Sequence, residues 1–308
     1  MADNYTLLDR FFTSAHGGSV TNHMYWVTAT PGSTKGEVIP KQGFGDLPTI
    51  FDRLEAKGIS WKFYVQNYDP RITFRAKVLG DRGSQIVWVP LLDYARYVDN
   101  PKLFSKIVPI EEYYDDLRRG TLPAVSYIAP SGSSENPPGS IKAGETFVRT
   151  MISALMRSSS WSSSAFTWTY DDWGGWYDHV KPPQVYGFRA PALLVSPYAK
   201  RGYVSHKTLD FTSILKFIED NWGLKSLASR DRRAHSIADG FDFSAAPREP
   251  AFVSRERVVP KPKQPRRMAV YVSYVAALLL VLLVIGMAAW SERRRSRRPL
   301  KPGAEVAA

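Results

Sequence analysis

One segment near the C-terminus constrains this chain more than any other, because residues Met268–Trp290 are long and apolar enough to cross a membrane. The segment reads MAVYVSYVAALLLVLLVIGMAAW and contains no charged residue. A run of about 20 apolar residues matches the hydrocarbon thickness of a bilayer. Tyr271, Tyr274 and Trp290 lie towards its ends, where amphipathic rings favour the membrane interface. The alternative, a helix buried in a protein core, is disfavoured because basic residues crowd both flanks.

Most of the net charge lies beside this segment. The formal net charge is +12, and residues 261–308, with ten Lys or Arg and two Glu, carry +8 of it. Basic residues next to a membrane span are attracted to anionic lipid headgroups. A nucleic-acid-binding protein instead places its Lys and Arg on the folded domain. The charge therefore indicates a membrane, and we expect no nucleic-acid partner.

Composition divides the chain into four parts. Residues 1–243 have the composition of one globular α/β domain. Residues 244–267 hold five prolines and many charges without apolar periodicity, which predicts an exposed tether. Residues 268–290 form the predicted transmembrane helix and residues 291–308 a basic tail. The absence of cysteine excludes disulfides and thiolate metal sites.

Short apolar runs alternate with amphipathic runs in the first part, as expected for a mostly parallel sheet covered by helices. The expected strands are Trp61–Gln66, Ala124–Ala129, Ala165–Tyr170 and Ala192–Ser196, and the expected helices are Leu47–Lys57, Gly144–Arg157 and Leu209–Asn221. For the last of these helices, Asp210 or Thr208 is a plausible N-cap and Gly223 is a plausible C-cap.

The most informative stretch is Thr167–Pro183, TWTYDDWGGWYDHVKPP, in which an apolar strand ends in Asp171 and Asp172. Ligands bind at the carboxyl ends of strands in open α/β sheets. Adjacent carboxylates repel each other there unless a cation or a proton lies between them. A divalent metal with oxygen ligands is the usual solution. The alternative is a solvated Asp-Asp turn.

A second stretch, HGGSVTNHMY over His16–Tyr25, places Ser19 after two glycines and before a run that could start a helix. The N–H groups and dipole of a helix N-terminus favour an anionic substrate. A metal nearby would make the hydroxyl a nucleophile, and Asn22 and His23 could hydrogen-bond the transferring group. The alternative is a plain N-cap serine.

With these motifs in order, the chain resembles the bacterial phosphoesterase family that includes non-haemolytic phospholipases C and a related acid phosphatase. The resemblance runs from Leu8 to about Phe243. It rests on LLDRFF, GGSVTNH, SENPPGSIKAGETFV, TYDDWGGWYDHVKPP, RAPALLVSPYAKRGYVSH and DFTSILKFIEDNWGLKSL.

The resemblance implies an alkaline-phosphatase-like α/β/α sandwich and the hydrolysis of phosphate esters or phospholipids. Ser19 matches the family's nucleophile, which would form a covalent phospho-enzyme. Asp171 and Asp172 match the paired acidic ligands of a divalent metal ion. Asp178 and His179 match the end of the motif, where we expect them to support the metal directly or through its ligands.

The chain also departs from the family pattern. Family members begin with an apolar strand ending in Glu-Asn-Arg-Ser-Phe-Asp, and nothing like it occurs here. We therefore expect an N-terminally incomplete domain, with a natural start further upstream. The family's Glu-His-Pro is Glu135-Asn136-Pro137 here, and Thr21 replaces a common Pro.

Two functions follow. The first is a membrane-tethered, metal-dependent phosphoesterase of phospholipase C or acid phosphatase type. The second is a degenerate, inactive relative that acts as a surface binding domain. Trp173, Trp176 and Tyr177 could line a pocket for a choline-like cation or pack in the core.

Basic residues also orient the span. Six Lys or Arg follow the segment and six precede it, but the following cluster is denser. Relatives of this domain are commonly exported. We therefore expect a single-pass protein of the cell membrane, with the tail in the cytoplasm and the domain outside.

Overall fold

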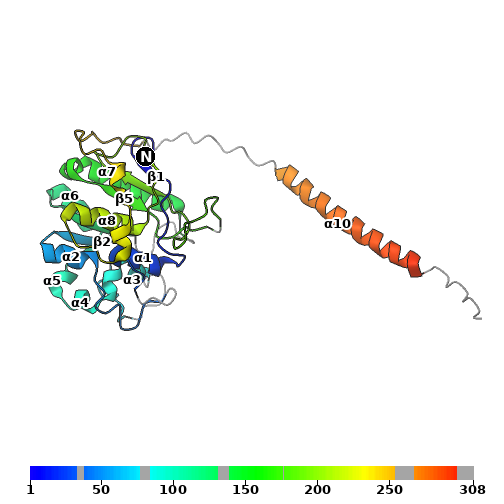
Figure 1. The fold of residues 1–308 in the computed structure, drawn as a ribbon, viewed down its shortest axis with the longest axis horizontal. Helices are drawn as coiled ribbons and strands as arrows, with labels where there is room; N and C mark the ends of the chain where they lie inside the picture. Colours follow the sequence, from blue (N-terminus) through cyan, green and yellow to red (C-terminus); the bar gives the residue numbers. More distant parts are fainter. Residues whose placement is uncertain (33–37, 77–83, 131–138, 176, 254–266, 297–308) are drawn as a thin grey trace, which may run out of the picture. The chain divides into compact units, whose positions relative to one another are not determined.

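The structure, a computed structural model, describes residues 1–32, 38–76, 84–130, 139–175, 177–253 and 267–296. The chain divides into two compact units, Met1–Val253 and Ser254–Ala308. The first unit contains sheets with helices packed on them, and the described residues of the second form a single helix (Figure 1).

The first sheet has the order β3-β2-β4 and is parallel throughout. Strand β2 pairs along its whole length with β4, from Trp61 beside Val125 to Val65 beside Ala129. Four of the five β2 residues are buried, as expected for a parallel strand with both faces covered. The bounds are β2 (Trp61–Val65), β3 (Ile107–Pro109) and β4 (Val125–Ala129).

The second sheet has the order β5-β6-β1-β7, and only β1 and β7 pair in parallel. The expectation of a mostly parallel sheet is therefore wrong for this half of the domain. The connection from β5 to β6 carries no helix among its described residues, so the chain turns back and pairs antiparallel. The bounds are β1 (Thr6–Leu8), β5 (Phe166–Thr169), β6 (Ala192–Val195) and β7 (Val204–Ser205).

All four expected strands and all three expected helices are present, and each has at least one end shifted, by no more than three residues. Helix α2 begins later than expected because Thr49 caps it: the Thr49 hydroxyl accepts from the Asp52 N–H at 3.2 Å, and Asp52 Oδ2 accepts from the Thr49 N–H at 2.7 Å. Asp210 and Gly223 cap α8 as predicted. The larger helices are α1 (Ser19–Thr28), α2 (Ile50–Lys57), α6 (Glu111–Arg119), α7 (Ile141–Arg157) and α8 (Phe211–Trp222). The short ones are α3 (Ser84–Trp88), α4 (Ala95–Val98), α5 (Pro101–Phe104), α9 (Ser229–Arg233) and the 3-10 turns η2 (Pro90–Asp93), η3 (Ser159–Ser163) and η4 (Ile237–Gly240).

Aromatic rings hold α1 and α2 on the first sheet. Trp26 of α1 lies 4.4 Å from Tyr127 of β4, centroid to centroid, and Phe51 of α2 lies 4.8 Å from both Trp61 and Tyr127. Such contacts add to the area that the rings bury. They fix the N-terminal end of α1 relative to the carboxyl ends of the strands, where the sequence places its candidate site.

The start of the predicted tether belongs to the first unit. The Trp161 indole N–H donates to the Arg248 carbonyl at 2.9 Å, and the Ala251 N–H donates to the Tyr5 hydroxyl at 2.9 Å. Arg248 also donates to the Asn4 carbonyl at 3.2 Å. Arg248 and Ala251 therefore contact the domain, although most of residues 244–253 are exposed as a tether would be. The rest of the predicted tether, 254–266, lies outside the described residues.

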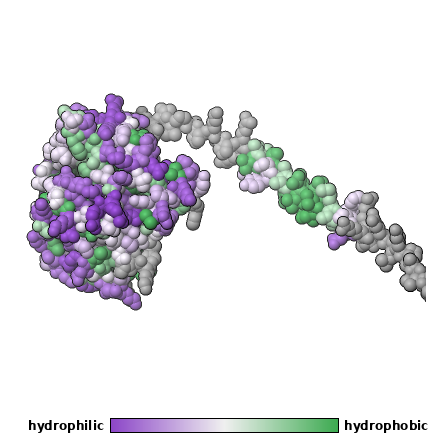
Figure 2. Space-filling view, viewed as in Figure 1, coloured by the Kyte–Doolittle hydropathy of each residue, from purple (hydrophilic) through white to green (hydrophobic). Residues whose placement is uncertain are grey.

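The second unit contains α10 (Arg267–Ser296), which includes the predicted span. Within Met268–Arg293 the most apolar 18-residue window has a mean hydropathy of 2.7, and none of that window is buried. Apolar residues cover much of this helix in Figure 2. The chain thus has one helix, among the described residues, that is long and apolar enough to span a membrane.

Glu219 of α8 is a buried acid. Its residue is 2% exposed, and its Oε1 accepts from the Leu227 N–H at 3.3 Å, a group that also donates to Asp231 Oδ2 at 2.6 Å. Burial and the neighbouring Asp231 carboxylate raise the pKa of Glu219 from 4.5 to about 8. Between about pH 4.5 and pH 8, Glu219 therefore keeps its proton in the folded chain but has lost it in the unfolded chain.

We expect the free energy of unfolding to fall as pH rises from about 4.5 to about 8, because in this window the folded state binds more protons than the unfolded state. Glu219→Gln should flatten this dependence. Urea unfolding of the full chain in detergent at pH 5, 6.5 and 8 measures it. Glu249 is exposed, so Glu249→Gln is the control and should keep the wild-type change of unfolding free energy with pH. The same change with pH in Glu219→Gln as in the wild type would contradict the expectation.

Candidate active site

Helix α1 begins at Ser19, as the sequence indicates. Gly18 is the N-cap residue, so the alternative role of Ser19 as N-cap is taken by its neighbour. A side chain at Gly17 would lie 2.9 Å from Thr21 Cβ, which is why glycine fits the tight approach to the helix. Ser19 is half-buried in the first turn, at the N-terminal end of the helix. Anions are stabilised at such a position.

Asn22 fixes the loop that leads to Ser19. Its residue is fully buried, its amide nitrogen donates to the Gly17 carbonyl at 2.9 Å, and its amide oxygen accepts from the Ala15 N–H at 3.1 Å. Both amide atoms therefore hold the loop. The predicted contact between Asn22 and a transferring group stays a prediction.

His23 lies one turn after Ser19. Its Nδ1 is 2.8 Å from the Ser19 carbonyl, and since a carbonyl only accepts, Nδ1 carries the proton. The other nitrogen, Nε2, then holds the ring's lone pair when the imidazole is neutral. The ring packs edge-on against Trp26, with centroids 5.8 Å apart.

Asp171 comes from a distant part of the sequence to the same place. Its Oδ2 lies 3.7 Å from His23 Nδ1. This oxygen is buried and accepts no hydrogen bond among the described residues. A buried carboxylate oxygen without a donor is costly, and such atoms are frequent at functional sites. The fold therefore brings together Ser19, His23 and Asp171, as the sequence motifs suggested separately.

Asp172 has a structural contact of its own. Its Oδ1 accepts from the Gly174 N–H at 2.7 Å, and Gly174 has φ +64°, a conformation that favours glycine. Asp172 therefore closes a turn, as in the alternative of a solvated Asp-Asp turn, although its partner at Gly174 was not predicted. Asp171 and Asp172 differ, since one carboxylate faces His23 and the other closes a turn.

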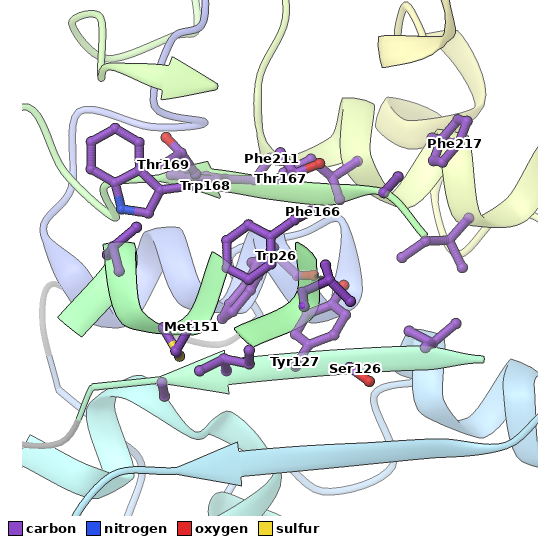
Figure 3. A pocket seen from close by; sticks show the side chains of 18 of the residues that line it. Trp26, Ser126, Tyr127, Met151, Phe166, Thr167, Trp168, Thr169, Phe211 and Phe217 are labelled. Carbon is purple, nitrogen blue, oxygen red and sulfur yellow. Dashed lines mark hydrogen bonds between the residues drawn. The ribbon is translucent and has the colours of Figure 1, made fainter. Parts of the chain in front are cut away.

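A cavity of about 950 Å³ opens beside these side chains. Its polar residues include Ser19, Asn22, His23, Asp171 and Asp172, and most of the rest of its lining is apolar. The interior runs between β4 and β5, where the side chains of Trp26, Phe166 and Tyr127 gather (Figure 3). Large apolar pockets with a few convergent polar groups are the usual form of ligand sites.

Asp178 and His179 do not line this cavity. Asp178 forms a two-point ion pair with Arg189, at 2.8 Å to Nε and 2.7 Å to Nη2. The guanidinium holds the pKa of Asp178 well below its usual range. The His179 side chain is 76% exposed. The predicted roles of both residues at a metal stay predictions, and the partner Arg189 had no recognisable signal in the sequence.

The predicted metal lacks a full set of ligand side chains among the described residues. Within the described ranges, no three or more His, Asp or Glu side chains lie close enough together to hold a metal ion. Asp171 and His23 provide two ligand side chains. The described residues therefore do not fit a complete divalent-metal site. Glu135, Asn136 and Pro137, which the sequence singled out, lie outside the described residues.

The aromatic residues of the motif are not alike. Trp173 lines the cavity and packs edge-on against Phe188, with centroids 5.6 Å apart. Tyr177 is 85% exposed, and Trp176 lies outside the described residues. Trp173 is thus partly core and partly pocket wall.

A buried hydrogen-bond network around Asp210 holds the segment that leads to Ser19, and the sequence did not reveal this network. Asp210 is 1% exposed, and its Oδ2 accepts from the Ser14 hydroxyl at 2.9 Å and from Arg230 at 2.8 and 3.0 Å. The Arg230 guanidinium lies between the rings of Tyr25 and Tyr186, 4.8 and 4.5 Å from their centroids. Asp210 was recognisable only as a helix cap. Its tertiary partners are 20 and 196 residues away.

Comparison with known proteins gives a consistent family. The sequence pattern described as "Phosphoesterase family" matches residues 1–225. Phospholipase C B of Mycobacterium tuberculosis (strain CDC 1551 / Oshkosh) is 27% identical over 295 residues, covering 80% of this chain and 54% of that protein. A non-hemolytic phospholipase C of Burkholderia pseudomallei is 29% identical, covering 71% and 39%. Non-specific phospholipase C6 of Arabidopsis thaliana is 24% identical, covering 92% and 59%. The chain thus spans about half the length of these relatives.

A solved structure shares the fold. A protein of the alkaline phosphatase superfamily from Vibrio parahaemolyticus superposes with a TM-score of 0.50 at 13% identity, covering 78% of this chain and 64% of that one. At this identity the likeness concerns the fold alone. It confirms the predicted α/β, alkaline-phosphatase-like architecture.

Proposed function

Because this chain belongs to the phosphoesterase family, we propose that it hydrolyses phosphate esters, with Ser19 as the nucleophile. One observation carries the proposal: Ser19, His23 and Asp171 meet at a large cavity although Asp171 lies far from the other two in sequence. The names of the relatives and the apolar helix α10 favour a phospholipid over a soluble ester.

The chemistry follows from the position of Ser19. The N–H groups at the start of α1 would hold the phosphoryl oxygens, where the developing negative charge is stabilised. The Ser19 oxygen attacks phosphorus and loses its proton, the ester bond breaks, and the alcohol leaves with a proton. Water then attacks the phosphoserine, which restores the serine and releases phosphate or a phosphomonoester. His23 Nε2 is a suitable proton acceptor or donor for these steps.

A divalent metal, if bound, would clamp the phosphoryl oxygens and lower the pKa of the serine hydroxyl. Asp171 is the strongest candidate among the described residues to contact it, because its Oδ2 accepts no hydrogen bond there. No step above depends on the ion, since the described residues do not complete its ligand set.

Hydrolysis by the full chain in detergent tests the proposal. The substrates are p-nitrophenyl phosphate and p-nitrophenyl phosphorylcholine, each assayed with added Mg²⁺, Ca²⁺, Mn²⁺ or Zn²⁺. Turnover is expected with at least one substrate, and acid quenching should trap a phosphate on the peptide that contains Ser19. Absence of turnover under all conditions would favour the second candidate, an inactive binding domain, which the incomplete ligand set also favours.

We also propose that α10 anchors the domain in the cell membrane in a single pass. Replacing Leu280 and Val281 with arginine, near the middle of the span, should release the chain into the soluble fraction. Each arginine costs about 3 kcal/mol at a helix centre. Ser291→Arg, at the end of the span, is the control and should stay in the membrane after an alkaline carbonate wash. Release of the control, or retention of the double variant, would argue against the anchor.

The orientation is testable in the same cells. With the tail in the cytoplasm and the domain outside, protease added to intact cells should cut the domain. A domain that stays protected while known surface proteins are cut would reverse the orientation.

A further inference from the structure

Among the described residues, the two sheets of the domain face each other with edge strands that pair on one side only. Strand β4 is an edge strand of the first sheet, and β5 is an edge strand of the second. All five residues of β4 and all four of β5 line the same cavity. Side chains alternate between the two faces of a strand, so consecutive residues share only their backbone edge. The cavity is therefore bounded by two strand edges, with β5 above and β4 below in Figure 3.

The hydrogen bonds on the other side of β4 show which of its peptide groups face the cavity. The Val125 N–H donates to the Ser60 carbonyl, and the Ala129 carbonyl accepts from the Gln66 N–H, both on the β2 side. Since peptide groups alternate between the two edges, those of Ser126 and Ile128 point away from β2.

The same reasoning applies to β5. The Leu7 N–H donates to the Tyr203 carbonyl on the β7 side, so Thr6 rather than Leu7 is the hydrogen-bonded partner of β6. Leu194 then faces β1, and Leu193 and Val195 face β5. In β5, Phe166 and Trp168 pair with them, which leaves the peptide groups of Thr167 and Thr169 directed to the cavity.

We propose that this cavity is the seat of one additional β-strand, supplied by an extended apolar polypeptide segment that pairs with β4 and β5 together. In Figure 3 the order of labels, Phe166 to Thr169 and Ser126 to Tyr127, shows the two strands running in the same direction, so one strand can continue both sheets into one. Helices α7 on one side and α1 and α8 on the other contribute Met151, Trp26 and Phe211 to the lining. A strand that is covered on both faces is usually a continuous run of apolar residues. We therefore expect the inserted segment to be apolar along its whole length.

A lipid chain is the competing occupant, and the backbone distinguishes the two. An acyl chain satisfies the apolar lining but offers no partner to the peptide groups of Ser126, Ile128, Thr167 and Thr169. A buried backbone group without a partner is costly. A peptide strand satisfies both the lining and these groups. The inference does not depend on hydrolysis, so it stands or fails separately from the proposed activity.

Amide hydrogen exchange of the full chain in detergent tests whether the cavity accepts a strand that pairs with β4 and β5. The amides of Ser126, Ile128, Thr167 and Thr169 should exchange faster than those of Tyr127 and Trp168 in the same strands. The probe is a peptide with a core of alternating valine and isoleucine, about five residues long to match β4, between pairs of lysines. Bound peptide should slow the four amides by at least about tenfold.

The matched control is the same peptide with N-methylated core amides, which keeps the side chains but removes the donors and places methyl groups between the two backbone edges, so that the strand cannot pair. It should give no protection. Equal protection by both peptides, or protection by a short-chain phosphatidylcholine alone, would mean that the cavity binds apolar groups without strand pairing. Four amides already protected in the chain without peptide, or left unprotected by the probe at saturation, would overturn the proposal as well.

Discussion

Replacing Ser19 with alanine is expected to lower kcat/KM for the hydrolysed p-nitrophenyl ester by roughly 10³- to 10⁶-fold, the range seen when a covalent nucleophile is removed. Without the hydroxyl, no phospho-enzyme forms, and only the binding groups at the start of α1 remain. The fold should be unaffected, because Gly18 rather than Ser19 caps the helix. Initial rates and the yield of trapped phosphopeptide measure the two effects.

A matched control separates catalysis from helix stability. Ser229 is also the first residue of a helix, α9, and is exposed. Ser229→Ala makes the same chemical change at the equivalent helix position and should leave the rate unchanged. A rate in Ser19→Ala within about threefold of wild type would remove Ser19 from the mechanism, and the nucleophile would then have to be sought elsewhere on the cavity wall.

The second large effect concerns stability. Asp210→Ala removes three interactions at once. Arg230 loses the only ion-pair partner that it has among the described residues, the Ser14 hydroxyl loses its acceptor, and α8 loses its N-cap. Removing one partner of a buried pair costs about 3–5 kcal/mol because the other charge stays buried. For a domain of this size the loss should lower Tm by about 10 °C. Thermal unfolding followed by near-UV circular dichroism measures it.

The same helix offers the control. Asp220 is an exposed residue of α8 that pairs with Lys216, and Asp220→Ala should cost under about 0.5 kcal/mol. The double variant Asp210→Ala/Arg230→Met should recover part of the stability, since it leaves no unpaired charge. A loss in Asp210→Ala as small as that in Asp220→Ala would show that the network does not stabilise the domain.

Local sequence signals predicted elements well where the signal is short-range. The apolar runs at β2, β4, β5 and β6 and the caps Asp210 and Gly223 were readable because strand periodicity and capping depend on neighbours within a few residues. The direction of pairing was not readable. The antiparallel pairs of β6 with β5 and β1 depend on how a long connection returns, which no local pattern encodes.

The candidate site shows the same division. Ser19 at a helix start and Asp171 at a strand end were both predicted from local context. That Asp178 would pair with Arg189, and Asp172 with the Gly174 N–H, was not predicted, because an acidic residue in a motif looks the same whether it meets a ligand, an arginine or its own turn.

Four features of this protein could be recognised without coordinates: the apolar helix over Met268–Trp290, the family, the α/β class and the motifs that carry Ser19 and Asp171. Each of these rests on composition or on neighbours along the chain. Coordinates were needed to show that Asp171 lies 3.7 Å from His23, that the described residues do not complete a metal site, and that β4 and β5 face each other across a cavity. These facts depend on which backbone edges and side chains meet after folding, and contacts between residues far apart in the chain leave no periodic trace in one sequence.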